Sequence, residues 1–150
     1  MKSVFNKTDV DEILERLKHL TPESQPVWGK MNVGQMLAHC NVTYEMVYTD
    51  KHPKATGIKK FLLKLFVKTP VCNSKPYPKN SRTAPQFLIA TEKVFEDEKK
   101  RLSDHIIQTL SHGEAYFDGK ESNSFGSLTA QEWSNMFYKH LDHHLNQFGV

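Results

Sequence analysis

The order of apolar and polar residues predicts four long helices. In each of four segments, apolar residues recur every three or four positions, which places them on one face of a helix. These segments are 8–20, 32–50, 86–110 and 129–149. Proline, glycine and polar residues separate them, so we expect each segment to form an amphipathic helix that buries its apolar face.

Residues suited to helix ends support two of these segments. Asn32 followed by Gln35, and Thr129 followed by Glu132, have the spacing of a capping box, in which each side chain accepts a hydrogen bond from the backbone N–H of the other residue. Gly149 stands where a C-terminal cap is expected. The pattern therefore predicts helix starts near residues 32 and 129.

The connections between the long helices differ in character. Residues 58–68 alternate apolar residues with lysines, which predicts a short amphipathic helix with a basic outer face. Residues 69–85 contain four prolines and are not expected to form regular helix. Gly113 is expected to end the third long helix, and residues 112–128 to form a loop whose aromatic residues pack against the end of the bundle.

Together these elements predict an all-α protein. Four long helices with a long crossover between the second and the third are typical of a four-helix bundle. A chain of 150 residues fits one domain, so residues 1–150 are expected to share a single core. The segment between the second and third helices is then a basic insertion into the bundle.

Positive charge is concentrated in residues 51–82. The formal net charge of the whole chain is only +3. This segment, by contrast, holds no acidic residue and nine basic ones: Lys51, Lys54, Lys59, Lys60, Lys64, Lys68, Lys75, Lys79 and Arg82. Such a surface attracts acidic partners, and the attraction weakens with salt. Nucleic acid is not the expected partner, because no groove-reading motif accompanies the charge.

Several classes of protein are not expected. Residues 1–7 lack the apolar stretch of a secretory signal, and the run 61–67 is interrupted by Lys64 and too short to span a bilayer. We therefore predict a cytoplasmic protein without a membrane span. Cys40 and Cys72 form no disulfide or metal-binding pattern, and Cys40 is expected to be a small buried apolar residue. The serine-hydrolase motif Gly-x-Ser-x-Gly and a glycine-rich phosphate loop are both missing from the sequence.

Three histidines form the candidate site. His140 and His144 lie four residues apart in the last predicted helix, on its apolar face. His39 lies at the edge of the apolar face of the second helix and can also point inward. Buried imidazoles need hydrogen-bond partners or a cation. Three of them around one divalent ion leave positions open for water, as in catalytic zinc sites, but the spacing alone fits ordinary core histidines equally well.

Neighbouring residues are assigned smaller roles. His143 is expected to face solvent or to support the site from outside the ligand set. Gln35, one turn before His39, and Gln147, just after His144, are candidates to hydrogen-bond the ligands. Because imidazole ligands must be neutral, an ion bound to them is expected to leave as the pH falls below about 6.5, the unperturbed pKa of histidine.

Two motifs of the chain resemble the DinB-like superfamily, and in particular a small uncharacterised branch of it. One is the Met-Leu-Ala-His sequence that ends at His39, within residues 31–40. The other is the His-x-x-His-His-x-x-Gln run from His140 to Gln147, within residues 138–149. The resemblance covers the chain from about residue 27 to its end.

The resemblance implies a bundle with up-down-down-up connections and a divalent metal ion, usually zinc or nickel, held by the residues at His39, His140 and His144. Characterised relatives include thiol-dependent transferases and a thiol-dependent isomerase that use a low-molecular-weight thiol other than glutathione. Many others are classed only as metal-dependent hydrolases. The branch commonly carries His-Pro ahead of Phe-Gly, whereas Ser-Asn-Ser, residues 122–124, precedes Phe125 here; this departure leaves catalysis open.

Two hypotheses from different classes follow. In the first, the protein binds a divalent ion and acts on a small-molecule substrate as a metal-dependent hydrolase or thiol transferase. In the second, it is a non-catalytic helical binding module that uses residues 51–82 to hold an acidic partner. A homodimer is compatible with both. The sequence names no substrate and does not decide between the two.

Overall fold

The computed structural model describes residues 2–150 and is mostly helical, with 58% of the chain in helices. The predicted all-α class is therefore confirmed. The long helices are α1 (Lys7–Lys18), α2 (Val33–Tyr48), α5 (Phe95–Phe117) and α6 (Ala130–Gln147). The shorter elements are α3 (Gly57–Phe66), α4 (Lys68–Cys72), the 3-10 turn η1 (Pro85–Phe87), and the two strands β1 (Glu121–Ser122) and β2 (Gly126–Ser127).

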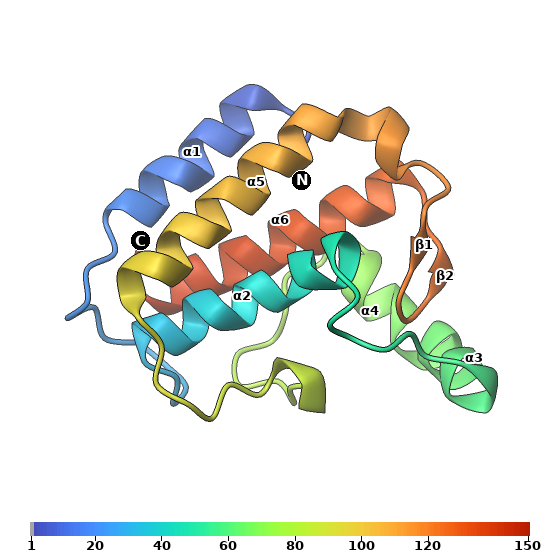
Figure 1. Cartoon of the computed structure of the whole chain (residues 1–150), viewed down its shortest axis with the longest axis horizontal. Helices are drawn as coiled ribbons and strands as arrows, with labels where there is room; N and C mark the ends of the chain where they lie inside the picture. The colour runs from blue at the N-terminus through green and yellow to red at the C-terminus, as the bar shows by residue number, and fades with distance from the viewer. Residues whose placement is uncertain (1) are drawn as a thin grey trace.

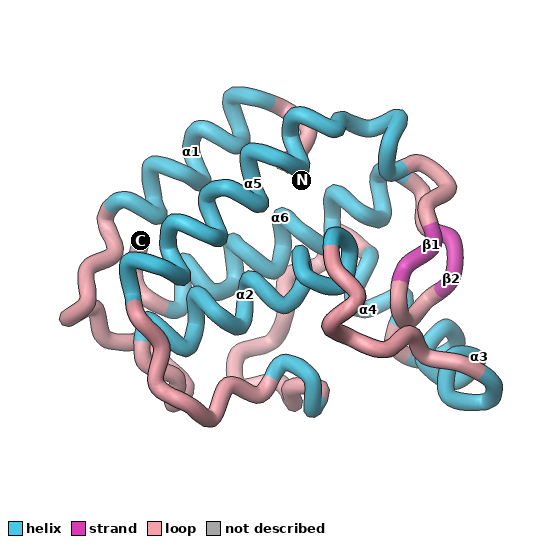
Figure 2. Tube along the Cα trace, in the orientation of Figure 1, coloured by secondary structure: helices cyan, strands magenta, loops and turns pink. Residues whose placement is uncertain are grey.

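The four long helices pack side by side, with α2 against α5 and α6, and α1 against α5 and α6 (Figure 1). Helices α2 and α5 run in one direction, and α1 and α6 run in the other. The long connection between the ends of α2 and α5 crosses the molecule and carries α3, α4 and η1 (Figure 2). This connection covers the face of α2 and α6 on which the histidines lie.

The core lies between these helices and is rich in aromatic rings. Tyr44 of α2 stacks on Phe137 of α6, with ring centroids 4.8 Å apart. Phe117, at the end of α5, packs edge-on against Phe137 and Trp133. The predicted capping boxes at both helix starts are present, with Asn32 and Thr129 as the N-caps. Residues far apart in the sequence therefore hold α2 and α6 in a fixed relation.

The third long helix begins later than the sequence predicts. Residues 86–94 were expected to be helical, but only the turn η1 forms, and α5 starts at Phe95. The apolar spacing of residues 86–94 fits a helix, yet residues 88–94 form no helix, and the backbone of this segment packs against α2. At Gly34 of α2, an added Cβ would lie 2.8 Å from the carbonyl oxygen of Lys93, so the two backbones are in close contact. Tertiary packing overrides local periodicity here.

Three other expectations need correction. Residues 69–72 are not irregular but belong to the short helix α4. Pro70 lies in the first turn of α4, where a backbone N–H has no partner within the helix, so its missing N–H removes no helical hydrogen bond. The expected loop 112–128 contains a short antiparallel pair, in which Glu121 faces Ser127. Gly113 has a φ of 69° and interrupts the helical path, but one more helical turn follows and ends at Phe117. Propensity rules missed the hairpin because each strand has only two residues.

Two further expectations concern the membrane and the cysteines. Among residues 2–150, no helix is both long enough and apolar enough to cross a bilayer. Cys40 is buried among core residues, as predicted, with its Sγ 3.8 Å from the Sδ of Met36. Burial raises the pKa of the Cys40 thiol far above its usual range, so this residue is a core side chain and no thiolate.

Candidate metal centre

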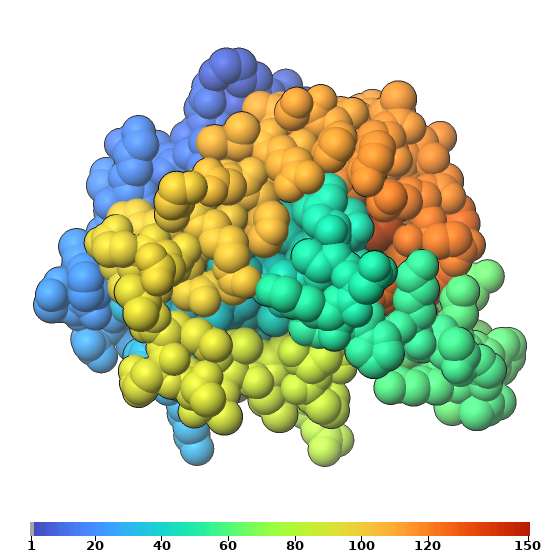
Figure 3. Space-filling model, viewed as in Figure 1, coloured from blue at the N-terminus to red at the C-terminus, as the bar shows by residue number. Residues whose placement is uncertain are grey.

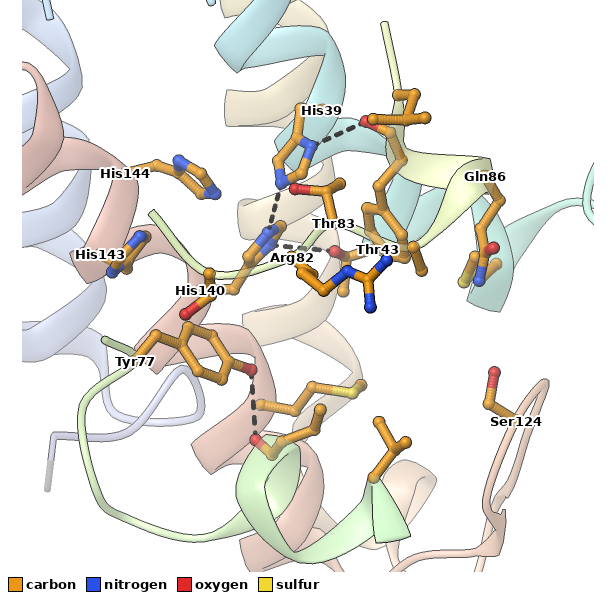
Figure 4. A pocket seen from close by; sticks show the side chains of 18 of the residues that line it. His39, Thr43, Tyr77, Arg82, Thr83, Gln86, Ser124, His140, His143 and His144 are labelled. Atoms are coloured by element: carbon orange, nitrogen blue, oxygen red, sulfur yellow. Dashed lines mark hydrogen bonds between the residues drawn. The ribbon is translucent and has the colours of Figure 1, made fainter. Parts of the chain in front are cut away.

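The three histidines singled out in the sequence lie together in the structure. His39 comes from α2, and His140 and His144 come from successive turns of α6. Their candidate ligand nitrogens all lie within 4.8 Å of one another. Figure 4 shows the three rings turned toward a common point. Residues a hundred positions apart therefore meet because α2 and α6 pack side by side with their histidine-bearing faces opposed.

The spacing of the rings suits a shared ion. The Nε2 atoms of His39 and His140 are 3.0 Å apart. Two nitrogens that each bind one tetrahedral zinc ion at about 2.0–2.1 Å lie roughly 3.3 Å apart, so this separation is close to that of two ligands. The ring of His144 completes the triangle, with its centroid 4.5 Å from that of His39 and 4.8 Å from that of His140.

The other nitrogen of each ring is held by a hydrogen bond. Nδ1 of His39 donates to the backbone carbonyl of Phe87, 2.9 Å away. Nδ1 of His144 lies 2.8 Å from Oε1 of Gln147. Nδ1 of His140 lies 3.0 Å from the hydroxyl of Thr43. These bonds orient all three rings so that Nε2 faces the common point, the arrangement that outer hydrogen bonds give metal-binding histidines.

The partners of these nitrogens also fix where the protons are. A carbonyl oxygen can only accept, so His39 carries its proton on Nδ1 when neutral. The amide of Gln147 donates its Nε2–H to the carbonyl of Trp28, 2.7 Å away, which turns Oε1 toward His144. His144 therefore also carries its proton on Nδ1. The Nε2 lone pairs of both rings consequently point at the common site.

Thr43 can serve His140 in either of two states. Without a cation, Nε2–H of His140 donates to Nε2 of His39, and the Thr43 hydroxyl donates to Nδ1 of His140. With a cation, Nδ1–H of His140 donates to the same hydroxyl, and its Nε2 is free to bind the ion. A hydroxyl both donates and accepts, so it satisfies His140 in both states. The donor set thus fits a divalent ion.

Burial keeps these imidazoles neutral. His39 and His144 are only 5% and 7% exposed. Loss of solvation lowers the pKa of His39, although its bond to the Phe87 carbonyl raises it. The same loss, followed by repulsion from the His39 ring, lowers the pKa of His144 to about 3. Burial and the two neighbouring rings place the pKa of His140 well below 6.5. Neutral imidazole is the form that binds metal.

A cavity of about 880 Å³ opens beside the three rings. Its walls come from α2, α6, the connection between α2 and α5, and the hairpin loop before α6. Most of the wall is apolar, and Arg82 and Ser124 are among the residues that add polar groups to it (Figure 4). A cavity of this volume and character is typical of small-molecule sites in proteins.

One family model matches the chain, over residues 2–149, and its description reads Protein of unknown function (DUF1569). The chain belongs to this family. The match covers nearly the whole sequence, including all three histidines, but the description assigns no activity and does not mention the DinB-like superfamily. No match was found among curated proteins or among solved structures.

His143 lies beside the site but outside the three clustered histidines, which agrees with one of the two places expected for it. It lines the cavity, half-buried, and its ring is 5.0 Å from that of His144. The rings of Trp28 and Tyr77 meet it edge-on, each with its centroid 5.8 Å away. His143 is therefore a residue of the cavity wall that packs between two aromatic rings. It is not one of the three histidines whose ring nitrogens cluster.

The outer hydrogen-bond partners were only partly predictable. Gln147 was proposed for this role and fills it. Gln35 does not fill it, because its half-buried side chain accepts a hydrogen bond from the backbone N–H of Asn32 and so closes the capping box. Thr43 could have been found from its place four residues after His39, on the same helical face. The Phe87 carbonyl carries no sequence signal, because any residue there has one.

Proposed function

We propose that this protein binds one divalent metal ion through His39, His140 and His144. The observation that carries the proposal is the set of three anchored Nδ1 atoms, which leaves the other three ring nitrogens facing one another in a neutral cluster of two buried histidines and the half-buried His140. Three imidazoles suit zinc and nickel equally, and either ion fits this donor set. Histidines that only fill a protein core have no reason to direct three ring nitrogens toward one another.

We further propose that the ion acts on a small molecule bound in the adjoining cavity. A divalent ion supplies Lewis acidity, which polarises a carbonyl group or activates water or a thiol. The chain contributes the rest: the apolar walls exclude bulk water, Arg82 offers positive charge to an acidic group of the substrate, and His143 presents an imidazole from the wall. The reaction class is hydrolysis or thiol transfer.

The helix directions support placing this family near the DinB-like proteins. The parallel pair α2 and α5, flanked by antiparallel α1 and α6, is the up-down-down-up order that the resemblance implies (Figure 1). The histidines also fall on the second and fourth long helices, as that resemblance requires. We propose this relationship from the helix directions and the histidine motifs together. If the reaction is thiol transfer, the co-substrate is a low-molecular-weight thiol.

Metal content is the direct test. The metal-stripped wild-type protein should bind about one zinc or nickel ion per chain in calorimetric titration, whereas H140A and H39A should bind more than about 100-fold more weakly, since each loses one of three ligands. H143A is the matched control, because His143 is adjacent on α6 and half-buried but outside the cluster. It should bind like the wild type.

Two results would refute the metal proposal. One is a wild-type protein that binds neither ion. The other is an H140A variant that keeps wild-type affinity while its circular dichroism shows a folded chain. Assays of the loaded enzyme with ester or amide substrates, and with electrophiles in the presence and absence of added thiol, then separate hydrolysis, which consumes only water, from transfer, which requires the thiol.

A further inference from the structure

Helix α3 exposes an apolar face to solvent. Its ten residues include five large apolar side chains that are between 45% and 73% exposed: Ile58, Phe61, Leu62, Leu65 and Phe66. No residue of α3 is buried. In Figures 1 and 3 the helix stands at the edge of the molecule, away from the four long helices. Contiguous exposed apolar side chains of this kind mark interaction surfaces.

The two sides of α3 have different surroundings. At 100° per residue, the five exposed side chains form one continuous stripe. On the other side, Leu63 is partly buried and packs against the core, and it lines the large cavity together with Val67 and Val71. One side of α3 is thus part of the protein, while the stripe has no partner among residues 2–150.

Lysines border the stripe on both edges. Lys59 lies along one edge and Lys64 along the other, and neither forms an ion pair within the described part of the chain. Lys60 and Lys68, which lie nearer the protein, pair with Glu121 and Glu132. No acidic residue occurs anywhere in residues 51–82. The free charges beside the stripe are therefore all positive.

We propose that α3 is a docking helix for the surface of a bilayer that contains anionic lipids. An apolar stripe flanked by lysines is the composition of helices that lie in the membrane interface, where the apolar side chains enter the acyl boundary and the lysines meet lipid phosphates. Each lysine near an anionic surface adds to this attraction. This inference is independent of the metal proposal.

A second copy of the chain fits the stripe less well. A symmetric contact through α3 would bring Lys59 and Lys64 of both copies together, and like charges repel. A helix of ten residues is about 15 Å long, so one of its faces offers far less than the roughly 800 Å² per partner of a stable interface. An anionic surface instead complements the charge along the entire stripe.

Docking through α3 would bring one wall of the cavity near the membrane. Leu63 of α3 and the neighbouring Val67 and Val71 line the cavity, and Leu63 lies on the side of α3 that faces the protein. An apolar cavity that opens beside a membrane-bound helix is suited to compounds that partition into lipid. The inferred surface therefore also suggests amphipathic molecules as the class to screen against the cavity.

Vesicle sedimentation tests the proposal with the full-length protein. The wild type should sediment with vesicles of equal parts phosphatidylglycerol and phosphatidylcholine, but not with phosphatidylcholine alone, and binding should weaken as salt rises from about 0.1 M to 0.5 M. The triple variant I58S/L62S/L65S should lose binding, and K59E/K64E should bind more than about tenfold more weakly. The control is I107S, which removes a 51% exposed apolar side chain from α5.

Three outcomes would overturn the proposal. They are a wild type that does not bind anionic vesicles, a triple variant that binds as well as the wild type, and an I107S variant that loses binding to the same degree. Light scattering coupled to size-exclusion chromatography adds the dimer test. A wild-type dimer that the triple variant converts to a monomer would assign the stripe to a second copy instead of a membrane.

Discussion

At the scale of single residues, the site depends on atoms that do not touch the common point. Thr43, Gln147 and the Phe87 carbonyl each bind one Nδ1 atom and thereby orient the three rings, while Gln147 and the carbonyl also fix the proton of His144 and His39 on Nδ1. These bonds hold the rings in the interior, where loss of water lowers the pKa of each one. Hydrogen bonds therefore orient the rings, and burial keeps them neutral.

The metal-free protein should lose stability in acid because of this burial. The pKa of folded His144 is about 3, while that of an unfolded histidine is about 6.5. Between these values the unfolded chain binds a proton that the folded chain does not, so the free energy of unfolding falls as pH falls, by up to about 1.4 kcal/mol per pH unit. Urea unfolding with a chelator present, at several pH values from 7.5 to about 4.5, measures this slope.

The comparison variant for the acid prediction is H144L, which lacks the titrating group. Its free energy of unfolding should fall less steeply with decreasing pH than that of the wild type, whatever its absolute stability. Equal slopes in the two proteins would contradict the prediction. The lowered pKa values also mean that acid should release a bound ion at a lower pH than the value of about 6.5 expected from the sequence alone.

At the scale of elements, the connection between α1 and α2 supports the end of α6. The backbone N–H of Val27 donates to the carbonyl of Gln147, and the Gln147 amide donates to the carbonyl of Trp28, both at 2.7 Å. Gly29 follows with φ of +85°, and a Cβ added there would lie 2.4 Å from Nε2 of Gln147. The connection therefore holds in place the amide that orients His144.

The substitution G29A should consequently weaken metal binding without touching a ligand. The added methyl group displaces the Gln147 amide, so His144 loses its acceptor, and zinc affinity should fall about 10-fold or more in calorimetric titration. G119A is the matched control, since Gly119 has a similar φ of +77° but no atom within 4 Å of an added Cβ. Equal affinities of G29A and G119A would show that the amide contact does not matter.

At the scale of the whole molecule, the site joins the two halves of the chain. His39 belongs to the second long helix and His140 and His144 to the last, so an ion bound to all three would link α2 directly to α6. The connection that carries η1 covers the same site through the Phe87 carbonyl. Binding at this point should therefore stabilise the packing of the molecule as a unit.

Thermal unfolding should report this linkage. A ligand at a concentration of about 1,000 times its Kd adds about 4 kcal/mol to the free energy of unfolding, which for a chain of this size corresponds to a rise in Tm of about 10 °C. Differential scanning fluorimetry of the stripped protein with and without zinc measures the rise, and a chelator should reverse it. In H140A the rise should be nearly absent; an undiminished rise there would point to binding elsewhere.

The sequence by itself determined the helices with strong local signals. The capping boxes at Asn32 and Thr129 and the apolar periodicity of α2 and α6 are local properties, so both helices begin where predicted. The i, i+4 spacing likewise put His140 and His144 on one face, and it did so without reference to any other part of the chain.

Only the tertiary structure decided what lies between and around these helices. Residues 86–94 have helical spacing, but only the turn η1 forms there, and the backbone of Lys93 packs against Gly34. His39 meets His140 and His144 only because α2 packs against α6, far along the chain. The hydrogen bond from Nδ1 of His39 to the carbonyl of Phe87 likewise joins residues far apart in the sequence. Local patterns fix which face of a helix is apolar, but packing in three dimensions determines which faces meet.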